Sequence, residues 1–259
     1  MRLSASLVLY KNEPNMVLKA VESLFNTPLE INLIVIDNSP SAELSEIFSN
    51  LSNFKIDYFY QDGRNLGFGK GHNLALSKIQ NSDYHLILNP DVYFESHTII
   101  ELIDYLDKNP DIGLIQPKIY YPNGELQYLC KRYPSFFLLF ARRFVPQYLK
   151  GLFKDYLNWY EMRDTGYNRI IDVPYLSGCF MLFRKKYLDE IGYFDENIFM
   201  YLEDADLTLR MSQKYRTVFY PDVWIYHHWA KGSYKSLRLM LISIRSAFYF
   251  FGKHGWRFF

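Results

Sequence analysis

The stretch Tyr84-His-Leu-Ile-Leu-Asn-Pro-Asp91 is an apolar run of strand length that stops abruptly at polar residues. Segments of the same kind occur before it, at residues 4–10, 33–37 and 55–60. Helical periodicity separates them, after Pro14 and again from about residue 69 to 78. Strands that alternate with helices predict βαβ units, and therefore a mainly parallel, Rossmann-like α/β sheet with helices on both faces.

Polar side chains stand at the ends of three of these predicted strands. Asn12, Asp37 and Asp91 each lie at or just past the end of an apolar run. In parallel sheets of this kind, ligands bind beyond the carboxyl ends of the strands. We therefore expect one site to collect all three residues.

The alternation of strands and helices is lost after residue 120. Before that point, Ser96 is a candidate N-cap for an amphipathic helix that contains residues 99–106, and residues 114–120 form a further predicted strand. Residues 121–172 are rich in aromatic and basic side chains, and strand-like segments at 173–183 and 216–220 follow. We interpret the irregular segment as an insertion in one domain that spans residues 1–259, and not as a separate domain.

Composition limits the class of protein. The chain has 259 residues and a formal net charge of +1, which does not indicate a nucleic-acid partner. Aromatic residues make up 19%, which is typical of a protein that binds sugars or a membrane surface, and equally of an aromatic core. Cys130 and Cys179 are too far apart for a zinc site or a disulfide framework. The first apolar run is too short for a signal peptide, and no run reaches the roughly 18 apolar residues of a membrane span, so we expect a cytoplasmic protein.

A series of short motifs runs through the chain. They are Leu9-Tyr-Lys-Asn12, Ile36-Asp-Asn-Ser39, Arg64-Asn-Leu-Gly-Phe-Gly-Lys-Gly-His-Asn73, Asn89-Pro-Asp91, Ser177-Gly-Cys-Phe-Met-Leu-Phe-Arg184, Glu203-Asp204 and His227-His-Trp229. In this order they resemble the inverting glycosyltransferases of family 2, which have the GT-A fold. The segments Ser233-Tyr-Lys-Ser236 and Lys253-His-Gly-Trp256 are most similar to the bacterial rhamnosyltransferase branch, which builds O-antigen, capsule and related surface polysaccharides. The resemblance implies that residues 1–120 bind the nucleotide sugar and residues 121–259 the acceptor.

The resemblance also implies a divalent metal, Mn²⁺ or Mg²⁺, that neutralises the diphosphate leaving group. The family's metal motif usually offers two acids, but here the first is Asn89. We therefore expect Asp91 alone to bind the metal and Asn89 to hydrogen-bond the ribose or phosphate. His227 takes the place of the histidine that completes the site in related enzymes, with His228 as the alternative. The competing interpretation is an ordinary Asn-Pro-Asp turn and a structural histidine.

Inversion requires a base that removes the proton of the acceptor hydroxyl. By resemblance to the family's acidic pair, Asp204 is that base, while Glu203 orients the acceptor or stiffens the loop. Asp206 is a candidate helix N-terminal acid that favours the helix dipole. Alternatively, all three acids belong to a solvated helix start, although the aromatic residues before them make idle charge costly.

Further residues are expected to bind the donor. The glycine segment lacks the full spacing of a dinucleotide fingerprint, so Gly67 and Gly71 are expected to let the backbone approach the nucleotide at a helix N-terminus. The resemblance implies that Asp37 accepts the ring N–H of the base, which uracil and thymine both present. The motifs assign the following to the substrate site as well: Tyr10, Asn12, Asn38, Arg64, Asn65, Asn73, Ser177 and Gly178.

The C-terminal segment, residues 235–259, predicts an amphipathic helix. Its apolar face comprises Leu237, Met240, Leu241, Ile244, Phe248 and Phe251. Basic residues mixed with Trp and Phe are typical of an interfacial membrane anchor, and Arg142 and Arg143 favour membrane contact too. A helix packed on the domain, or on the partner in a homodimer, has the same pattern.

The leading hypothesis is an inverting, metal-dependent transferase that moves L-rhamnose from dTDP-rhamnose to a polyprenyl-diphosphate-linked oligosaccharide at the inner face of the membrane. A second hypothesis keeps the enzyme but uses a UDP-hexose such as UDP-galactose, UDP-glucose or UDP-N-acetylglucosamine. A third is a non-catalytic subunit that binds a sugar nucleotide or a glycan. The presence of both Asp91 and Asp204 disfavours the third, because a site without activity need not keep both.

Overall fold

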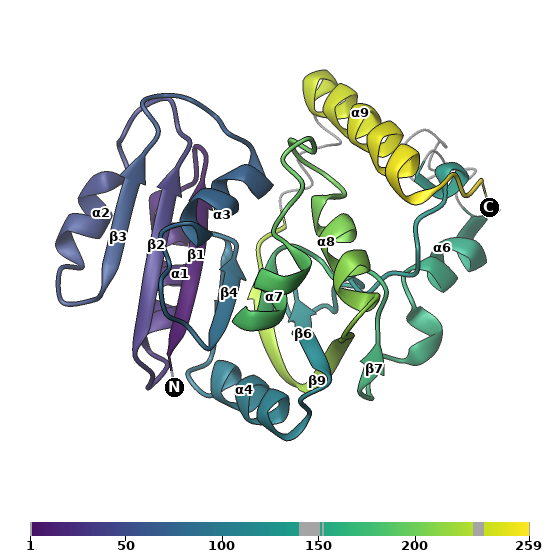
Figure 1. Ribbon diagram of the computed structural model, residues 1–259, viewed down its shortest axis with the longest axis horizontal. Coiled ribbons are helices and arrows are strands. Elements are labelled where there is room, and N and C mark those ends of the chain that lie inside the picture. The colour runs from purple at the N-terminus through teal and green to yellow at the C-terminus, as the bar shows by residue number, and fades with distance from the viewer. Residues whose placement is uncertain (1, 140–150, 152, 230–235, 259) are drawn as a thin grey trace.

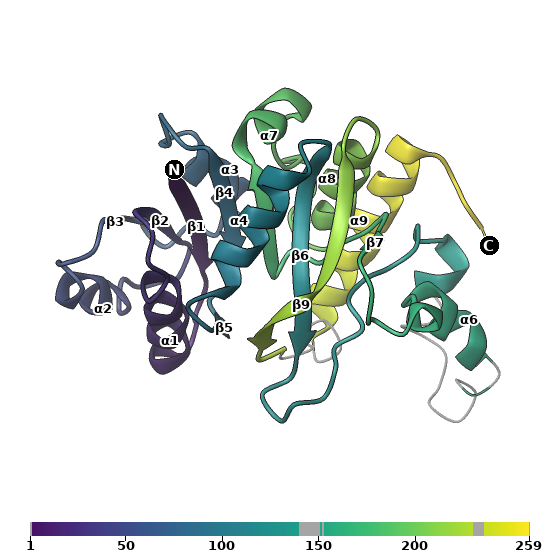
Figure 2. The same ribbon diagram turned by 90° about the horizontal axis from the view of Figure 1, so that it is seen from below.

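The computed structural model describes residues 2–139, 151, 153–229 and 236–258. Its strands form one mixed sheet with helices on both faces (Figure 1 and Figure 2). The strands are β1 Leu3–Leu9, β2 Ile31–Asp37, β3 Ile56–Tyr60, β4 Tyr84–Leu88, β5 Val92–Phe94, β6 Ile112–Tyr120, β7 Ile171–Asp172, β8 Phe180–Arg184 and β9 Arg216–His227. The helices are α1 Pro14–Phe25, α2 Ser45–Asn50, α3 Phe68–Leu76, α4 Thr98–Lys108, α6 Lys154–Tyr160, α7 Lys185–Ile191, α8 Glu203–Ser212 and α9 Leu237–His254, with a 3-10 turn at Arg163–Thr165.

The first half of the sheet has the predicted βαβ pattern. Its strands lie in the order β3-β2-β1-β4, and every neighbouring pair among them is parallel. Pro14 occupies the first turn of α1, where a missing N–H costs nothing, and Glu13 caps the helix by accepting from the Met16 N–H at 3.0 Å. The parallel order brings the carboxyl ends of β1, β2 and β4 to one edge of the sheet.

The second half of the sheet contributes to the same edge. β8 is antiparallel to β4 and starts where β4 ends, with Phe180 opposite Leu88. β9 runs parallel to β6 and ends at His227, which pairs with Val92 of β5. Residues 177–179, the turn after β4 and the end of β9 therefore meet beyond one edge of the sheet.

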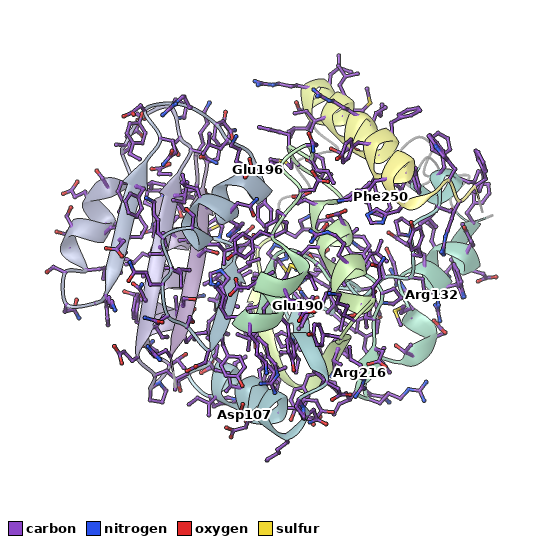
Figure 3. The ribbon with its side chains drawn as sticks, in the orientation of Figure 1. Asp107, Arg132, Glu190, Glu196, Arg216 and Phe250 are labelled. Carbon is purple, nitrogen blue, oxygen red and sulfur yellow. The ribbon has the colours of Figure 1, made fainter. Side chains whose placement is uncertain are left out.

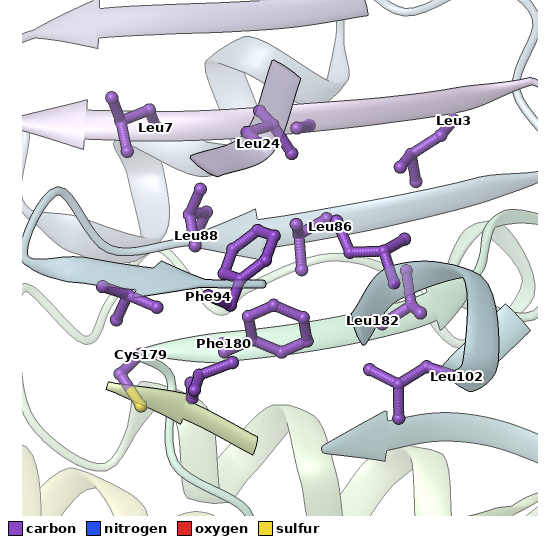
Figure 4. Close-up of a cluster of buried hydrophobic side chains, with 14 of the residues drawn as sticks. Leu3, Leu7, Leu24, Leu86, Leu88, Phe94, Leu102, Cys179, Phe180 and Leu182 are labelled. Carbon is purple, nitrogen blue, oxygen red and sulfur yellow. The ribbon is translucent and has the colours of Figure 1, made fainter. Parts of the chain in front are cut away.

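Two apolar clusters hold the layers together. One joins the sheet to α1, α2 and α4 and includes Leu24 of α1, Leu102 of α4 and Phe180 of β8 (Figure 4). The other joins the opposite face to α3, α7 and α8. Full burial of a leucine is worth about 1.5–3 kcal/mol relative to exposure, so these clusters fix the strand ends in place.

Several details differ from the sequence-based expectation. His97, and not Ser96, occupies the N-cap of α4, and its side chain makes no capping bond. Of the strand expected over 173–183, only the part from residue 180 is strand, in β8, while β7 lies just before the expected range. β9 is longer than residues 216–220. The short elements α2, β5 and α7 were not predicted. Arg142 and Arg143, like residues 233–235 of the tail motif, lie outside the described residues.

Candidate active site

Asp91 and His227 face each other at the shared edge of the sheet. The turn Asn89-Pro90-Asp91 leads directly into β5, whose pairing with β9 brings the His227 Nε2 to 3.6 Å from the Asp91 Oδ1. The backbone N–H of His228 donates to the Asp91 carbonyl oxygen at 3.0 Å, and its ring lies against Tyr93 instead. His227 is thus the histidine whose ring nitrogen points at the carboxylate.

Gln127 fixes the orientation of the His227 ring. The His227 Nδ1 lies 3.0 Å from the Gln127 Oε1, while the Gln127 Nε2 donates to the His227 carbonyl oxygen at 2.6 Å. An amide oxygen only accepts, so the proton of the neutral ring is on Nδ1 and the Nε2 lone pair faces Asp91. Burial lowers the pKa of His227 to about 4, and His228 adds to the shift, so the ring is neutral at pH 7.

This pair has the donor set of a divalent-cation site. Burial raises the pKa of Asp91 to about 6, and its Oδ1 is buried without a hydrogen-bond donor. A carboxylate oxygen and an imidazole lone pair that face each other repel unless a cation lies between them, and both are ordinary ligands of Mn²⁺ and Mg²⁺. Within the described residues, no group of three His, Cys, Asp or Glu side chains could hold a metal. The described part of the chain therefore offers two ligands, Asp91 and His227, and a bound diphosphate or water would have to supply the others.

Asp204 is held by three hydrogen-bond donors at the N-terminus of α8. The Tyr175 hydroxyl donates to its Oδ1 at 3.1 Å, and the N–H of Ala205 donates to the same oxygen at 2.9 Å. The backbone N–H of Gly178 donates to its Oδ2 at 2.9 Å. A carboxylate with both oxygens oriented in this way has one direction in which to accept a further proton.

The chain enters α8 through two residues in left-handed backbone conformations. Tyr201 has φ 71° and Leu202 has φ 69°. Residues other than glycine rarely adopt this region of backbone conformation. Such conformations persist only where the surrounding structure holds them, and they concentrate at functional sites. The strain lies directly before Glu203 and Asp204.

Glu203 points into the protein. It is buried, its Oε2 has no hydrogen-bond partner, and burial together with the neighbouring Asp204 charge raises its pKa well above the usual range. Both effects disfavour the charged form of this carboxyl group. Of the acidic pair, only Asp204 is oriented by donors on both oxygens.

Residues 177–179 connect the two carboxylates. The N–H of Asn89 donates to the Cys179 carbonyl oxygen at 2.9 Å, and the neighbouring Gly178 holds Asp204. Burial raises the pKa of the Cys179 thiol to about 12, and the charges of Asp91 and Asp204 add to it, which reflects how near both lie. Ser177 exchanges hydrogen bonds with the buried Gln116 amide through its own backbone. Ser177 and Gly178 therefore shape the site with backbone groups.

The glycine segment forms the N-terminus of α3. Gly67 has φ 86°, and a Cβ there would lie 2.4 Å from the Phe199 carbonyl oxygen, so only glycine fits. The Asn65 Oδ1 accepts from the Gly67 N–H at 2.9 Å, and the Asn38 Nδ2 donates to the Gly67 carbonyl oxygen at 3.1 Å. A Cβ on Gly71 would press on Val8 of β1 at 2.9 Å. These residues pack α3 closely on the sheet and on the loop before α8.

Asn73 has a different partner from the one expected. Its amide donates to the Phe194 carbonyl oxygen at 2.9 Å and accepts from the Phe194 N–H at 3.0 Å, with a further bond to Glu196. These bonds satisfy the side chain within the protein. Asn73 therefore joins the two halves of the chain and is not available to a nucleotide in this conformation.

Asp37 is also buried and hydrogen-bonded within the protein. It is fully buried, and its two oxygens accept from the Ser39 N–H at 2.8 Å and from the Tyr58 hydroxyl at 2.5 Å. Burial and the bond to Asp37 raise the pKa of Tyr58. In this conformation the carboxylate is not accessible to a nucleotide base.

The remaining predicted donor residues lie in the loops around this edge. Tyr10 is exposed, and its N–H donates to the Asn12 Oδ1 at 2.7 Å, so Asn12 shapes the loop after β1. Arg64 is exposed beside Asp62. The Asn89 side chain lowers the pKa of Asp91 against the larger effect of burial, while the Asn89 Oδ1 is buried without a partner. That oxygen is therefore an acceptor left without a donor within the described residues.

Sequence reasoning missed Gln127 and Tyr175. Gln127 lies 100 residues before His227, and Tyr175 lies 29 residues before Asp204. Both occur where no periodic pattern exists, so only the folded chain reveals them.

A family model and curated relatives both indicate that this chain is similar to glycosyltransferases. Residues 7–192 match the model of glycosyl transferase family 2. An N-acetylglucosaminyl-diphospho-decaprenol L-rhamnosyltransferase of Mycobacterium tuberculosis is 28% identical over 186 residues, which cover 64% of this chain and 57% of that protein. Rhamnosyltransferase WbbL of Escherichia coli K12 is 26% identical over 204 residues, which cover 75% and 71%. The chain thus spans little more than half the length of the mycobacterial relative.

A solved structure shares the fold. The mannosyltransferase PcManGT from Pyrobaculum calidifontis, in complex with GDP-Man and Mn²⁺, superimposes with a TM-score of 0.64 over 95% of this chain and 60% of that one, at 15% identity. This likeness and the family match confirm the GT-A fold that the motifs predicted.

Proposed function

Since this chain belongs to glycosyl transferase family 2, we propose that it is an inverting, metal-dependent transferase with Asp204 as its base. The observation that carries the proposal is the position of Asp204. Donors orient both of its oxygens, and one segment, residues 177–179, separates it from the Asp91–His227 pair. A base and a diphosphate-binding group are thereby held at opposite ends of a three-residue connection.

The reaction follows from this arrangement. An acceptor hydroxyl oxygen forms a bond to the anomeric carbon while the bond from that carbon to the diphosphate oxygen breaks. The hydroxyl proton passes to Asp204, and the nucleoside diphosphate leaves from the opposite face. General-base assistance of this kind is typically worth about 10²–10⁴-fold. Tyr175 and Gly178 hold the carboxylate so that little reorganisation is needed.

Asp91 and His227 would hold a divalent ion, Mn²⁺ or Mg²⁺, and the ion would offset the charge that develops on the leaving diphosphate. Gln127 keeps His227 in the tautomer that can bind it. The orphaned Asn89 Oδ1 supports a hydrogen bond to the ribose of the donor. Gly67, Gly71, Asn38 and Asn65 shape the α3 N-terminus, where backbone N–H groups and the helix dipole favour a phosphate.

We propose dTDP-rhamnose as the donor and a polyprenyl-diphosphate-linked glycan as the acceptor. The relatives support this choice, because one is named for L-rhamnose transfer to a decaprenyl-diphosphate-linked N-acetylglucosamine and another for rhamnose transfer. The step would belong to bacterial surface polysaccharide synthesis at the inner membrane face. The intact Asp91 and Asp204 disfavour a non-catalytic binding subunit.

Two measurements test this function. Calorimetric titrations with dTDP-rhamnose, UDP-galactose and UDP-N-acetylglucosamine, each with and without Mn²⁺, should show metal-dependent binding of dTDP-rhamnose alone. Incubation with a short-chain N-acetylglucosaminyl-diphospho-lipid should then release dTDP, and the product should carry rhamnose of inverted anomeric configuration. Preference for a UDP-sugar would overturn the donor and keep the mechanism. Binding of a donor with no transfer to any lipid-linked acceptor would favour a binding subunit.

A further inference from the structure

Helix α9 presents a row of exposed apolar side chains on its outer flank. Leu237 is 69% exposed, Leu241 58% and Phe248 52%. At 3.6 residues per turn these three positions lie within roughly 40° of one another around the helix axis. The helix lies on the outside of the domain, next to α8, as Figure 1 shows. Large apolar side chains grouped in this way mark a contact surface for something outside the chain.

The opposite flank of α9 is firmly attached to the domain. Phe250 is fully buried and lies on the side of the helix toward α8 (Figure 3). The Ser246 hydroxyl donates to the Met200 carbonyl oxygen at 2.7 Å. At its C-terminal end, Lys253 binds the buried Asp206 of α8. These contacts hold α9 in place on the domain. Packing on the domain therefore explains the buried flank of α9 but not its exposed row.

Aromatic residues extend the exposed row beyond the end of the helix. Trp256 is 44% exposed and Phe258 58%, and their rings lie 6.0 Å apart. The Trp256 ring also contacts Phe248 at 5.6 Å and Phe136 at 5.8 Å. Trp and Phe at the rim of an apolar surface are typical of the boundary between water and lipid.

The charge of the segment identifies the kind of partner. Residues 236–258 contain four basic residues, Arg238, Arg245, Lys253 and Arg257, and no Asp or Glu. Arg238 and Arg245 are exposed and fall beside the apolar row on the helical wheel. Their aliphatic stems can lie on an apolar surface while the guanidinium groups reach anionic groups at its edge. Two copies of this chain packed through the same row would instead bring like charges together.

We propose that α9 is a docking helix for an anionic lipid bilayer, with Leu237, Leu241, Phe248, Trp256 and Phe258 in the interface and Arg238 and Arg245 on lipid headgroups. The inference rests on the proposed function in one respect, since a lipid-linked acceptor gives the docking its purpose. Asp206, which binds the buried flank of α9, is two residues from Asp204. Docking would therefore hold the base at a fixed orientation to the membrane surface.

Co-sedimentation of the full chain with vesicles tests the proposal without donor or acceptor, so its outcome is independent of transferase activity. Vesicles of phosphatidylcholine with 30% phosphatidylglycerol should bind the protein, and pure phosphatidylcholine vesicles should bind it at least tenfold more weakly. Leu241→Glu with Phe248→Glu should lower the partition coefficient at least tenfold. Ile170→Glu, which places an acid at another exposed apolar position, should leave it unchanged. Arg238→Gln with Arg245→Gln should remove most of the dependence on phosphatidylglycerol and on salt.

Three results would overturn the proposal. The first is equal binding to both kinds of vesicle. The second is binding that the double Glu variant does not reduce, provided that its circular dichroism spectrum and melting temperature match those of the parent. The third combines two measurements: analytical ultracentrifugation shows a dimer for the parent and a monomer for the double Glu variant, while both bind vesicles equally. This result would assign the exposed row to contact with a second copy of the chain.

Discussion

The backbone N–H of Gly178 donates to the Asp204 Oδ2 at 2.9 Å and joins the start of β8 to the start of α8. A Cβ at position 178 would lie 3.3 Å from the Asp204 Cβ, tighter than most such contacts. The next residue, Cys179, accepts from Asn89 in the turn that carries Asp91. One short segment thus sets the distance between the carboxylate assigned to the metal and the carboxylate assigned to the base.

Replacement of the base should stop the reaction and spare donor binding. Asp204→Asn keeps the shape of the side chain but cannot take up the acceptor proton, so kcat should fall by about 10²–10⁴-fold. The dissociation constant for the nucleotide, measured by calorimetry, should stay within a few-fold of the parent value. Asp104→Asn, at an exposed position of α4, is the matched control. Retained turnover in Asp204→Asn would remove this residue as the base.

Tyr175 should act on the rate and not on donor affinity. Tyr175→Phe removes the hydroxyl that donates to the Asp204 Oδ1 at 3.1 Å and keeps the buried ring in place. Loss of one hydrogen bond of about 0.5–1.5 kcal/mol should lower kcat by roughly 3–10-fold. The KM for the donor should not change, because the hydroxyl that is lost bonds to the proposed base. A rise in donor KM with kcat unchanged would contradict this role.

Gln127 should control metal affinity from outside the ligand set. Gln127→Leu removes the acceptor that keeps the His227 proton on Nδ1, so the ring can rotate or change tautomer. Substitutions of this kind typically lower metal affinity by about 10–100-fold. Titration with Mn²⁺ in the presence of nucleoside diphosphate, followed by electron paramagnetic resonance, measures it. Gln80→Leu, at an exposed position, should leave the affinity unchanged. Equal affinities in both variants would show that Gln127 does not orient a ligand.

The first half of the fold was readable from the sequence because β1, β2 and β4 are buried on both faces. Apolar runs of strand length alternate there with helical periodicity, so β1 to β4 could be predicted. The meeting of polar residues from the ends of these strands at one edge of the sheet could be predicted as well. The second half lacks this regularity. β7 is only two residues long and β5 three, too short to leave a pattern.

Contacts between distant segments were beyond sequence reasoning. Asn73 matched a motif expected to bind nucleotide, yet its partner Phe194 lies 121 residues further on. The predicted apolar face of α9 was present, but periodicity does not tell which flank packs. Phe251 is buried, while Leu237 and Leu241 from the same predicted face are exposed.

A buried histidine pair should make stability fall in acid. Burial lowers the pKa of His72 to about 3, and its Nδ1 lies 2.7 Å from the Ser6 Oγ, which also contacts His85 at 2.9 Å. Between the ordinary pKa of about 6.5 and this value, the unfolded chain binds a proton that the folded chain does not. The free energy of unfolding should therefore be highest above pH 6.5 and should fall as the pH drops. One such histidine accounts for a loss of about 2 kcal/mol at pH 5.

Urea unfolding at pH 7 and pH 5 checks this dependence. His72→Gln can still bond to Ser6 but does not titrate, so the loss between the two pH values should shrink by about 2 kcal/mol. His97→Gln, at the exposed N-cap of α4, should leave the loss as in the parent. An unchanged loss in His72→Gln would mean that other groups cause the acid sensitivity.

Lys253 should contribute to both stability and turnover through Asp206. The fully buried Asp206 accepts from Arg210 at 2.9 Å within α8, and from Lys253 at 2.6 Å and His254 at 2.7 Å at the end of α9. Burial alone would raise the pKa of Asp206, but the cations Arg210 and Lys253, together with the hydrogen bond from His254, lower it. The charged carboxylate therefore depends on α9, and its contribution to stability is present near neutral pH and lost as the pH falls through its lowered pKa.

Lys253→Met keeps the length of the side chain and removes one of these cations. Loss of a partner from a buried ion pair costs several kcal/mol, but Lys253 is partly exposed and Asp206 keeps two other partners, so we expect a loss of about 1–2 kcal/mol in urea unfolding. Because α8 carries Asp204, kcat should fall as well, while donor affinity should not. Lys214→Met breaks the exposed pair with Glu190 and is the matched control, for which neither quantity should change measurably. A parent-like kcat in Lys253→Met, together with the expected loss of stability, would show that α9 supports the fold without positioning the base.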